Sequence, residues 1–308
     1  MAQAAVVAAT LLWSVVPLLT KVALLALSAP FIAAARLAQA AAMAGACWPR
    51  SWRPSADAYA ASGWRLAALA GLGLGGNYIF YALGLRHTTA SATNLIVQIE
   101  VVGLLVLARA FLNERLGSRR AIGAVLALVG VGLVGWSGES LRALLASEHF
   151  VGTILVAVAG LCWSAYAVLH KMALRKIRFQ HSLLPIFAAA AASCAPFALW
   201  GKPVAASAGA SQWAALGILG VPCTGLSYLL LAWGMERVSA STMGLMTSLL
   251  PVFTIIESHF FLGEQVTPYI ALGAAAAVSG VILVSTAAAG SLDSGSEGSI
   301  QYDARGGK

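Results

Sequence analysis

Hydrophobic residues fill long stretches of this chain, and polar residues gather in the short segments between them. Ten apolar runs of about 20 residues can be counted: 4–27, 30–48, 64–85, 91–112, 119–137, 152–174, 182–200, 213–234, 242–262 and 268–289. A helix of that length spans the hydrocarbon core of a bilayer. The runs are too long for transmembrane strands and do not alternate between apolar and polar residues. The pattern predicts an all-α integral membrane protein with ten transmembrane helices.

The composition agrees with this prediction. The chain of 308 residues is 60% hydrophobic and only 10% charged, too few polar residues to cover a soluble domain of this size. The first run has no Lys or Arg before it and is long, so we expect a retained helix rather than a cleaved signal peptide.

The net charge of +8 raises the possibility of a nucleic-acid partner, but its distribution favours another interpretation. With the N-terminus in the cytoplasm, the outer loops hold three cations, Arg86, Arg142 and Lys202. The inner loops hold ten: Arg50, Arg53, Arg65, Arg115, Arg119, Arg120, Arg175, Lys176, Arg178 and Arg237. Basic residues concentrate in cytoplasmic loops. The charge therefore predicts a multi-pass protein with both termini in the cytoplasm, and no nucleic-acid partner. The Ala-rich composition suits a bacterial source with GC-rich DNA, so we expect a bacterial cytoplasmic (inner) membrane.

The two halves of the chain resemble each other at an offset of 150 residues. "LLWSVVPLLTKVAL" (11–24) matches "LCWSAYAVLHKMAL" (161–174), and "FLNERL" (111–116) matches "FLGEQV" (261–266). Gly123 and Gly130 align with glycines of the last run in the same register. A single gap-free register over the whole chain indicates an internal duplication.

Because each half holds five helices, an odd number, the second half enters the membrane from the opposite side. We therefore predict two inverted repeats, residues 1–137 and 151–289. An outer linker (138–150) joins them, and a disordered cytoplasmic tail (290–308) follows. Inverted repeats of this kind are characteristic of secondary transporters that work by alternating access.

The sequence resembles the drug/metabolite transporter superfamily, in particular its ten-helix EamA-type members. The features that carry the resemblance are the "LLWSVVPLLTK" opening, Arg36 early in the second helix, the "FLNE" and "FLGE" helix ends, and the Gly-rich fifth and tenth helices. It covers roughly residues 4–288. It implies a cavity lined by helices 1, 3, 4, 6, 8 and 9, with helices 5 and 10 outside. It also implies transport of small solutes, often export of amino acids. Many relatives have a proline in the middle of helix 4, where this chain has Glu100 and Val101.

Two charged residues are predicted near the middle of the membrane, Arg36 and Glu100. A charge there costs about 2.5–3.5 kcal/mol on insertion scales, so it usually has a partner or a function. The repeat counterparts, Ile186 and Leu250, are apolar, so the scaffold does not require either charge. Glu100 is a candidate for proton coupling or for binding an ammonium group, and Arg36 for binding a carboxylate. The alternative is that the two neutralise each other or bond to backbone at a helix break.

The other candidate substrate-binding residues are aromatic or polar side chains at similar depth, and for each the alternative is ordinary packing or hydrogen bonding between helices. They are Trp13, Trp163, Asn77, Tyr78, Ser227 and Tyr228. Lys21 and Lys171 either line a vestibule or extend toward the nearest interface.

Three further features have alternatives of the same kind. "GLGLGGN" (71–77) superficially matches a dinucleotide-binding motif, but inside a membrane span it predicts close helix packing. Glu257 and His259 could form a proton path, although interfacial positions bonded to water are the simpler expectation. Glu114 and Glu264 are expected to cap or brace loops.

These residues together predict a secondary transporter of small polar or zwitterionic metabolites, with amino-acid export as the leading hypothesis. The main alternative is a carrier of anionic metabolites that uses Lys21, Arg36 and Lys171. A channel is a further alternative, although no segment resembles a selectivity filter. A membrane enzyme or receptor has no supporting cluster of catalytic or metal-ligating residues. We expect no metal or cofactor; the partners are the substrate, the lipid bilayer and protons.

Overall fold

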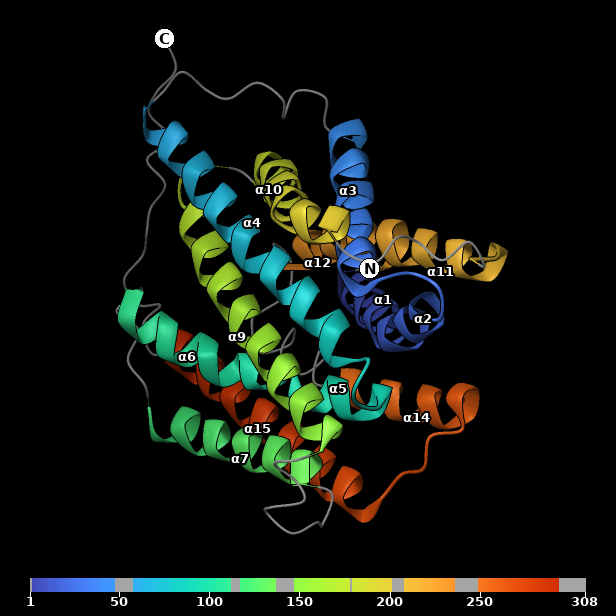
Figure 1. Cartoon of the computed structure of the whole chain (residues 1–308). Helices are drawn as coiled ribbons and strands as arrows, with labels where there is room; N and C mark the ends of the chain where they lie inside the picture. Colours follow the sequence, from blue (N-terminus) through green and yellow to red (C-terminus); the bar gives the residue numbers. More distant parts are fainter. Residues whose placement is uncertain are drawn as a thin grey trace.

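The computed structural model describes residues 2–47, 58–111, 117–136, 147–177, 179–200, 208–235 and 249–293, and these ranges are almost entirely helical, with no strand among them (Figure 1). In chain order the helices are α1 (Ala2–Ser14), α2 (Val16–Leu24), α3 (Ala29–Cys47), α4 (Ala58–Gly84), α5 (Ala90–Ile96), α6 (Ile99–Phe111), α7 (Ser118–Trp136), α9 (Glu148–Leu174), α10 (Phe179–Trp200), α11 (Ala210–Gly220), the π-helical segment η2 (Val221–Leu226), α12 (Ser227–Met235), α14 (Leu250–Leu262) and α15 (Pro268–Asp293).

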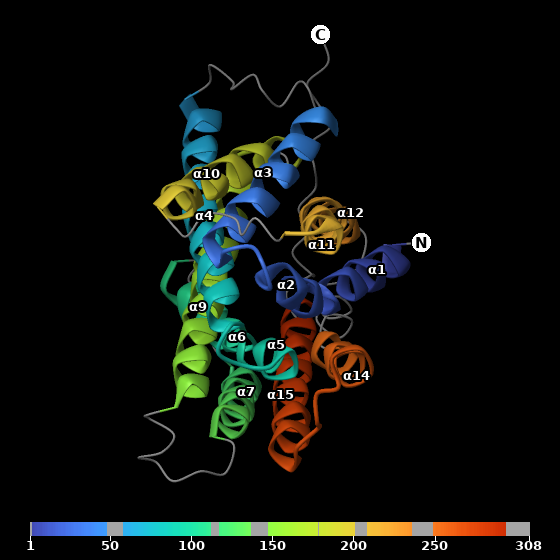
Figure 2. The ribbon, with the colours of Figure 1, turned by 45° about the vertical axis from the view of Figure 1, so that its right-hand side comes forward.

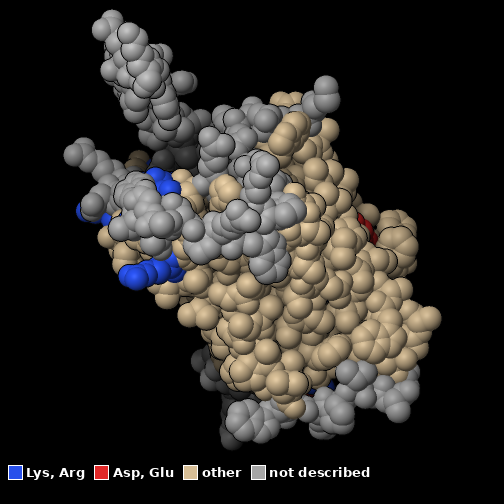
Figure 3. Space-filling model, turned by 90° about the horizontal axis from the view of Figure 1, so that it is seen from above, with Lys and Arg blue, Asp and Glu red and all other residues tan. Residues whose placement is uncertain are grey.

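The apolar helices coincide with the ten runs predicted from the sequence. By length and composition, seven helical segments of the described chain can cross a membrane, and three shorter apolar segments lie at 121–134, 250–262 and 268–283. Figure 3 shows a face whose described surface is mostly uncharged, with Lys and Arg near its margin. Leu199 and Phe260 are 87% and 78% exposed, as expected for side chains that face lipid rather than water. The prediction of an all-α membrane protein is confirmed.

Three of the predicted helices are interrupted rather than continuous. The first run divides into α1 and α2 at Val15, two residues before Pro17, which cannot donate to the carbonyl of Trp13. The fourth divides into α5 and α6 at residues 97–98. The eighth contains η2, with Pro222 at its start. Interruptions within the membrane free backbone groups, and transporters build their binding sites at such places.

The helices pack in pairs that the 150-residue offset relates to one another. α3 packs against α10, and α7 against α15, so each of these pairs joins a segment to its own counterpart (Figures 1 and 2). At the same offset, α4 corresponds to α12 and α9 corresponds to α1. The helices α4 and α9 are in contact, and so are α12 and α1. The boundaries of the two repeats remain a prediction.

Small residues let these helices approach closely. A Cβ added at Gly130 of α7 would lie 2.7 Å from the backbone of α15 at Gly273 and Ala277. A Cβ added at Gly71 would lie 2.5 Å from the carbonyl oxygen of Ile186 in α10. The second contact confirms that "GLGLGGN" is a packing surface, as small residues are in other membrane helices.

Two helices extend beyond the segments expected from the sequence, while the repeat boundaries stay a prediction. α9 begins at Glu148, within the predicted linker, because Ser147 caps it by accepting a hydrogen bond from the amide of Phe150 (3.1 Å). α15 continues to Asp293, so residues 290–293 are helical rather than part of a disordered tail. Residues 138–146 and 294–308 lie outside the described ranges.

Candidate functional site

Arg36 lies in the middle of α3 and is only 5% exposed. Its guanidinium stacks over the ring of Tyr78 on α4, with 4.6 Å between the guanidinium carbon and the ring centroid. Its Nη2 donates a hydrogen bond to the hydroxyl of Thr224, 3.2 Å away. The charge is thus held by a cation–π contact and one neutral acceptor.

Thr224 belongs to η2 and organises this part of the site. Its Oγ1 accepts from Arg36 and from the hydroxyl of Tyr78 (3.2 Å), and donates to the carbonyl of Leu219 (2.7 Å). A threonine hydroxyl offers one donor and two acceptor positions, so Thr224 uses all of them. The i→i−5 bond to Leu219 matches the spacing of a π-helix. Sequence reasoning missed this residue; the Pro222 and Gly225 that flank it in the span were the available signal.

No carboxylate of the described residues lies within 4.0 Å of the Arg36 guanidinium. Among the described residues, the ion pairs within 4.0 Å are Lys21–Glu264 and His87–Glu148. The Nε atom of Arg36 is buried without a hydrogen-bond partner in the same part of the chain. The structure therefore does not support the alternative in which Arg36 and Glu100 neutralise each other.

A group of aromatic side chains adjoins Arg36. The ring of Tyr228 on α12 makes edge-on contacts with Trp13 (5.6 Å between centroids), Phe187 (5.5 Å) and Tyr166 (6.1 Å). Trp163 in turn contacts Tyr166, at 6.0 Å. We call these five residues the aromatic cluster; they pack in one core with Tyr78. Trp13, Trp163, Tyr78 and Tyr228, predicted separately from the two halves, are brought together.

The cluster draws on more helices than the family resemblance implied. Arg36 comes from α3, the second transmembrane helix, and Phe187 comes from α10, the seventh. Helices α7 and α15, the fifth and tenth, pack against each other. Arg36 and Phe187 thus add the second and seventh helices to the site, beyond those that the resemblance implied would line the cavity.

Tyr166 is fixed by His170, which the sequence analysis did not single out. The Tyr166 hydroxyl and His170 Nδ1 are 3.1 Å apart, and His170 Nε2 is 2.8 Å from the hydroxyl of Ser182 on α10. The two side chains stand at i and i+4 on α9, where neighbours on a helix meet. The ring of Tyr166 is thus tied to two helices.

Glu100 lies in the first turn of α6, immediately after the interruption of the fourth helix, and is half-buried. The amide groups at a helix N-terminus favour a negative charge. Its backbone carbonyl accepts a hydrogen bond from Ser164 on α9 (2.8 Å). Because Ser164 follows Trp163, the start of α6 lies beside the helix that carries Trp163 and Tyr166 of the aromatic cluster.

Asn77 and Ser227 occupy the predicted depth, but their side chains bond to backbone. Asn77 Nδ2 donates to the carbonyl of Ala159 (2.9 Å), and Ser227 Oγ donates to that of Cys223 (2.7 Å). Both residues are at least 90% buried. The hydrogen-bonding alternative describes them better than a direct role in binding.

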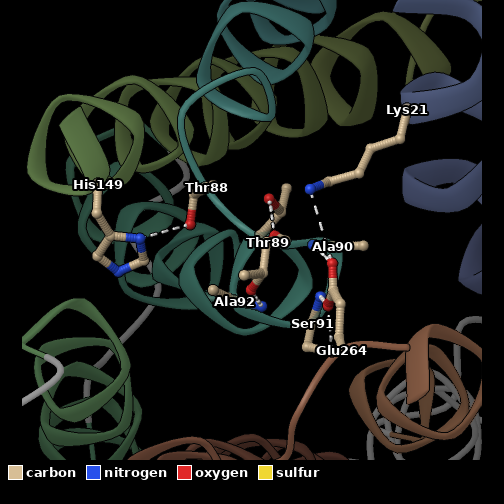
Figure 4. Close-up of polar contacts among 9 residues, drawn as sticks. Lys21, Thr88, Thr89, Ala90, Ser91, Ala92, His149 and Glu264 are labelled. Atoms are coloured by element: carbon tan, nitrogen blue, oxygen red, sulfur yellow. Dashed lines mark hydrogen bonds and ion pairs between the residues drawn. The ribbon is translucent and has the colours of Figure 1, made fainter. Parts of the chain in front are cut away.

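Lys21 does not join the cluster and instead pairs with Glu264 (Nζ to Oε1, 3.7 Å; Figure 4). Glu264 also accepts hydrogen bonds from the amides of Ala90 (2.8 Å) and Ser91 (3.0 Å) and from the Ser91 hydroxyl (2.9 Å). It thereby caps α5 from the connection between α14 and α15, which confirms the expected bracing role of Glu264. Gly263, with a φ of 66°, makes the left-handed turn that precedes it.

A chain of polar contacts links α4 to the interruption of the first helix. The Tyr81 hydroxyl donates to Asn94 (3.1 Å), and Asn94 donates to Thr254. Thr254 donates to the backbone carbonyl of Ser14 (3.0 Å), and the Ser14 hydroxyl lies 2.8 Å from Glu257 Oε1. Glu257 is therefore engaged with protein, in contrast to the water-bonded interfacial position expected from the sequence.

Metal binding finds no support in the described part of the chain. It contains no group of three or more His, Cys, Asp or Glu placed to hold a metal ion. The four cysteines are free thiols, and Cys194 and Cys223 are buried.

The sequence was then compared with known proteins. The sequence model of the EamA-like transporter family matches residues 1–136 and again residues 150–286. The chain belongs to the EamA-like transporter family. An uncharacterized transporter of Archaeoglobus fulgidus is 27% identical over 253 residues, which are 80% of this chain and 83% of that one. One of Haemophilus influenzae is 25% identical over 228 residues, 69% and 71% of the two chains.

Two further matches bear on the fold and the membrane. An uncharacterized inner membrane transporter of Escherichia coli, YhbE, is 30% identical over 196 residues, 63% of this chain and 59% of that one. A solved crystal structure superposes with a TM-score of 0.68, over 95% of this chain and 98% of that chain at 22% identity, which shows a shared fold. This EamA-family chain is thus a multi-pass membrane transporter, and its family indicates transport rather than enzymatic activity.

Proposed function

We propose that this EamA-family transporter is a secondary carrier that moves small zwitterionic metabolites, most simply amino acids, out of the bacterial cell by alternating access. The observation that carries the proposal is the buried Arg36, which has no carboxylate partner among the residues that the structure describes. A buried charge near the middle of a membrane is costly unless it is paired. A substrate carboxylate supplies the missing pair, and the planar guanidinium can bind it with two hydrogen bonds.

The second charge of a zwitterion would meet Glu100. Glu100 begins α6 beside the part of α9 that carries Trp163, and its carboxylate forms no ion pair within 4.0 Å among the described residues. The rings of Trp13 and Trp163 would surround the substrate, and aromatic faces attract an ammonium group. The predicted proton-coupling role of Glu100 is tested by the same variant, Glu100→Gln.

Alternating access requires that one side close while the other opens. With the N-terminus in the cytoplasm, as the charge distribution predicts, the Lys21–Glu264–α5 contacts lie at the outer end of the bundle. They join helices of the two halves, so we propose that they form an outer latch. At an offset of 150, their counterparts are Lys171, Glu114 and Ser241, which we propose as the inner latch. Glu114 and Ser241 lie outside the described residues.

The carrier of anionic metabolites has less support. That alternative needs Lys21, Arg36 and Lys171 to act on one ligand. Lys21 is paired with Glu264, and Lys171 is exposed, while only Arg36 adjoins the aromatic cluster. A single cation beside a carboxylate suits a zwitterion better than a multiply charged anion. The outward direction of transport is supported by the resemblance to metabolite exporters.

Counterflow in proteoliposomes tests the proposed substrate class. Vesicles that contain the purified protein would be loaded with unlabelled amino acids, and entry of labelled ones would be followed. We expect saturable entry of a subset, reduced by Arg36→Gln and by Glu100→Gln. Absence of exchange with any amino acid, from protein shown to be folded, together with exchange of organic or phosphorylated acids, would replace this proposal by the anionic one.

A further inference from the structure

The carboxylate of Glu257, on the apolar helix α14, lies against the end of α1, where the first membrane helix is interrupted. Its Oε1 lies 2.8 Å from the hydroxyl of Ser14, the last residue of α1. Its Oε2 is buried and has no hydrogen-bond partner in the described part of the chain. A buried carboxylate oxygen without a donor is unfavourable. The surroundings therefore favour a state in which Glu257 holds a proton.

The hydroxyl of Ser14 can satisfy both protonation states of Glu257. It lies 2.8 Å from Glu257 Oε1 and 2.9 Å from the carbonyl oxygen of Leu11, but it has only one hydrogen to donate. In the ionised state Ser14 donates to Glu257. When a proton binds, the Glu257 hydroxyl donates to Ser14 Oγ, and the Ser14 hydrogen turns to Leu11. One proton is taken up, and every donor of this group keeps an acceptor.

The position of Ser14 strengthens this preference. The carbonyl end of α1 carries partial negative charge, which disfavours a carboxylate and favours a proton. In transporters with broken helices, the carbonyl ends of half-helices are the places where coupling cations bind. The break follows from Pro17, and Thr254, one turn before Glu257, fixes it by donating to the carbonyl of Ser14.

The same contacts connect Glu257 to the proposed substrate site. Thr254 is reached from Tyr81 through Asn94, and Tyr81 lies one turn after Tyr78 on α4. η2, whose Thr224 accepts the hydrogen bond from Arg36, packs against α1, the helix that ends at Ser14. A change in the charge of Glu257 therefore acts on helices that also hold Arg36 and its partners.

The other titratable groups nearby are engaged elsewhere or lie outside this contact. α14 packs against α1, α2, α5 and α15, and the described parts of α1 and α5 carry no titratable side chain. The titratable groups of α2, of α14 itself and its following connection, of α15 and of the neighbouring η2 are Lys21, His259, Glu264, Tyr269, Asp293 and Cys223, with Asp293 at the far end of α15. Lys21 is paired with Glu264, and His259 Nδ1 bonds to the backbone carbonyl of Glu264 (3.0 Å).

From this geometry we propose that Glu257 binds the proton whose movement drives transport, while Glu100 is left to the substrate. The inference rests on the proposed function for its physiological meaning. The proton site itself can be tested without any substrate. It differs from the prediction made from the sequence, which gave the coupling proton to Glu100.

The first test is infrared difference spectroscopy of the substrate-free protein between acidic and alkaline pH. We expect the wild-type protein to show a carboxylic-acid band that disappears at alkaline pH. The band should be absent in Glu257→Gln, present in Glu100→Gln and shifted in Ser14→Ala, which removes the hydrogen-bond partner. A spectrum of Glu257→Gln identical to wild type overturns the inference, whether or not amino acids are transported.

The second test is transport of a labelled amino-acid mixture into proteoliposomes under a gradient of one pH unit, imposed in each direction. We expect one direction to drive up to about tenfold accumulation by wild type, for one proton per substrate. Glu257→Gln should keep counterflow and lose this accumulation, and Glu257→Asp should recover part of it. Glu100→Gln should weaken substrate binding but keep the response to the gradient.

Several results overturn the inference. Accumulation by Glu257→Gln equal to wild type would do so, as would a wild-type protein that exchanges amino acids but responds only to a sodium gradient. Loss of both activities in Glu257→Gln, with no recovery in Glu257→Asp, would give Glu257 a structural role. Absence of wild-type counterflow contradicts the proposed function instead. The infrared measurement then shows whether Glu257 binds a proton.

Discussion

Arg36 and Lys21 are two cations on neighbouring helices of the first half, and the structure treats them in opposite ways. Lys21 on α2 meets the carboxylate of Glu264, which also caps α5. Arg36 on α3 is more deeply buried, yet in the described part of the chain it meets the ring of Tyr78 and the hydroxyl of Thr224 and no carboxylate. Membrane proteins usually pair an intramembrane charge. The difference indicates that a ligand binds where a buried charge has no partner of opposite charge, and that a charge in the membrane is not by itself a sign of a binding site.

The largest effect in this comparison is expected from Arg36→Gln. Removing a charge-assisted contact worth about 1.5–3 kcal/mol should raise the substrate concentration at half-maximal counterflow by about 10- to 100-fold. The fold should survive, because the variant removes a buried charge that lacks an ionic partner. Arg36→Lys keeps the charge but loses the planar stacking on Tyr78, so it should recover only part of the activity. Activity close to wild type in Arg36→Gln would remove Arg36 from the site.

A smaller effect is expected from Thr224→Val, which removes the hydroxyl that holds Arg36 and Tyr78 while keeping the shape of the side chain. Each neutral hydrogen bond contributes about 0.5–1.5 kcal/mol, so we expect a loss of affinity of up to about tenfold in counterflow. Thr224→Ser retains the hydroxyl and serves as the matched control. Equal activity of the valine and serine variants would mean that Thr224 does not position Arg36.

The outer latch should affect the rate of transport more than affinity. Exposed ion pairs contribute about 0.2–1 kcal/mol, and Lys21 is partly exposed, with 31% of its side-chain surface accessible. Glu264→Gln keeps hydrogen-bonding capacity but weakens the pair with Lys21, so we expect a change in counterflow rate of a few-fold at unchanged half-saturation. Counterflow rates of Glu264→Gln, Lys21→Gln and the double variant measure the coupling between the two side chains. Independent effects of the two substitutions would contradict the latch.

The smallest effect is expected from Lys171→Gln. Because this side chain is exposed, whereas Arg36 is buried, half-saturation should change less than twofold. The same measurement separates the two substrate classes, since a carrier of anionic metabolites should lose affinity here. A tenfold loss in Lys171→Gln would favour the anionic alternative.

The sequence predicted the parts of this molecule that depend on periodicity and composition. The apolar runs located the membrane helices, and the 150-residue register paired Trp13 with Trp163 and Tyr78 with Tyr228, all of which meet in or beside the aromatic cluster. Depth along a helix follows directly from residue number, so side chains at similar depth could be grouped. The cost of a charge in the membrane singled out Arg36.

Contacts that depend on local backbone irregularity or on distant residues could not be predicted in the same way. Glu264 pairs with Lys21 across 243 residues of sequence, and no periodicity relates them. Thr224 reaches Arg36 because η2 shifts the register of the eighth helix, and composition alone does not distinguish a π-helix from an α-helix. Ser14 meets Glu257 at a helix break, whereas the sequence analysis expected a continuous helix.

The most direct test of the central claim is whether Arg36 recognises a carboxylate. Competition in counterflow would compare an amino acid that exchanges with its amide, which keeps the ammonium group but has no carboxylate. In the wild-type protein the amide should compete at least about tenfold more weakly, the effect of losing one charge-assisted contact. In Arg36→Gln the two compounds should compete equally. A preference for the amino acid that persists unchanged in Arg36→Gln would contradict the account.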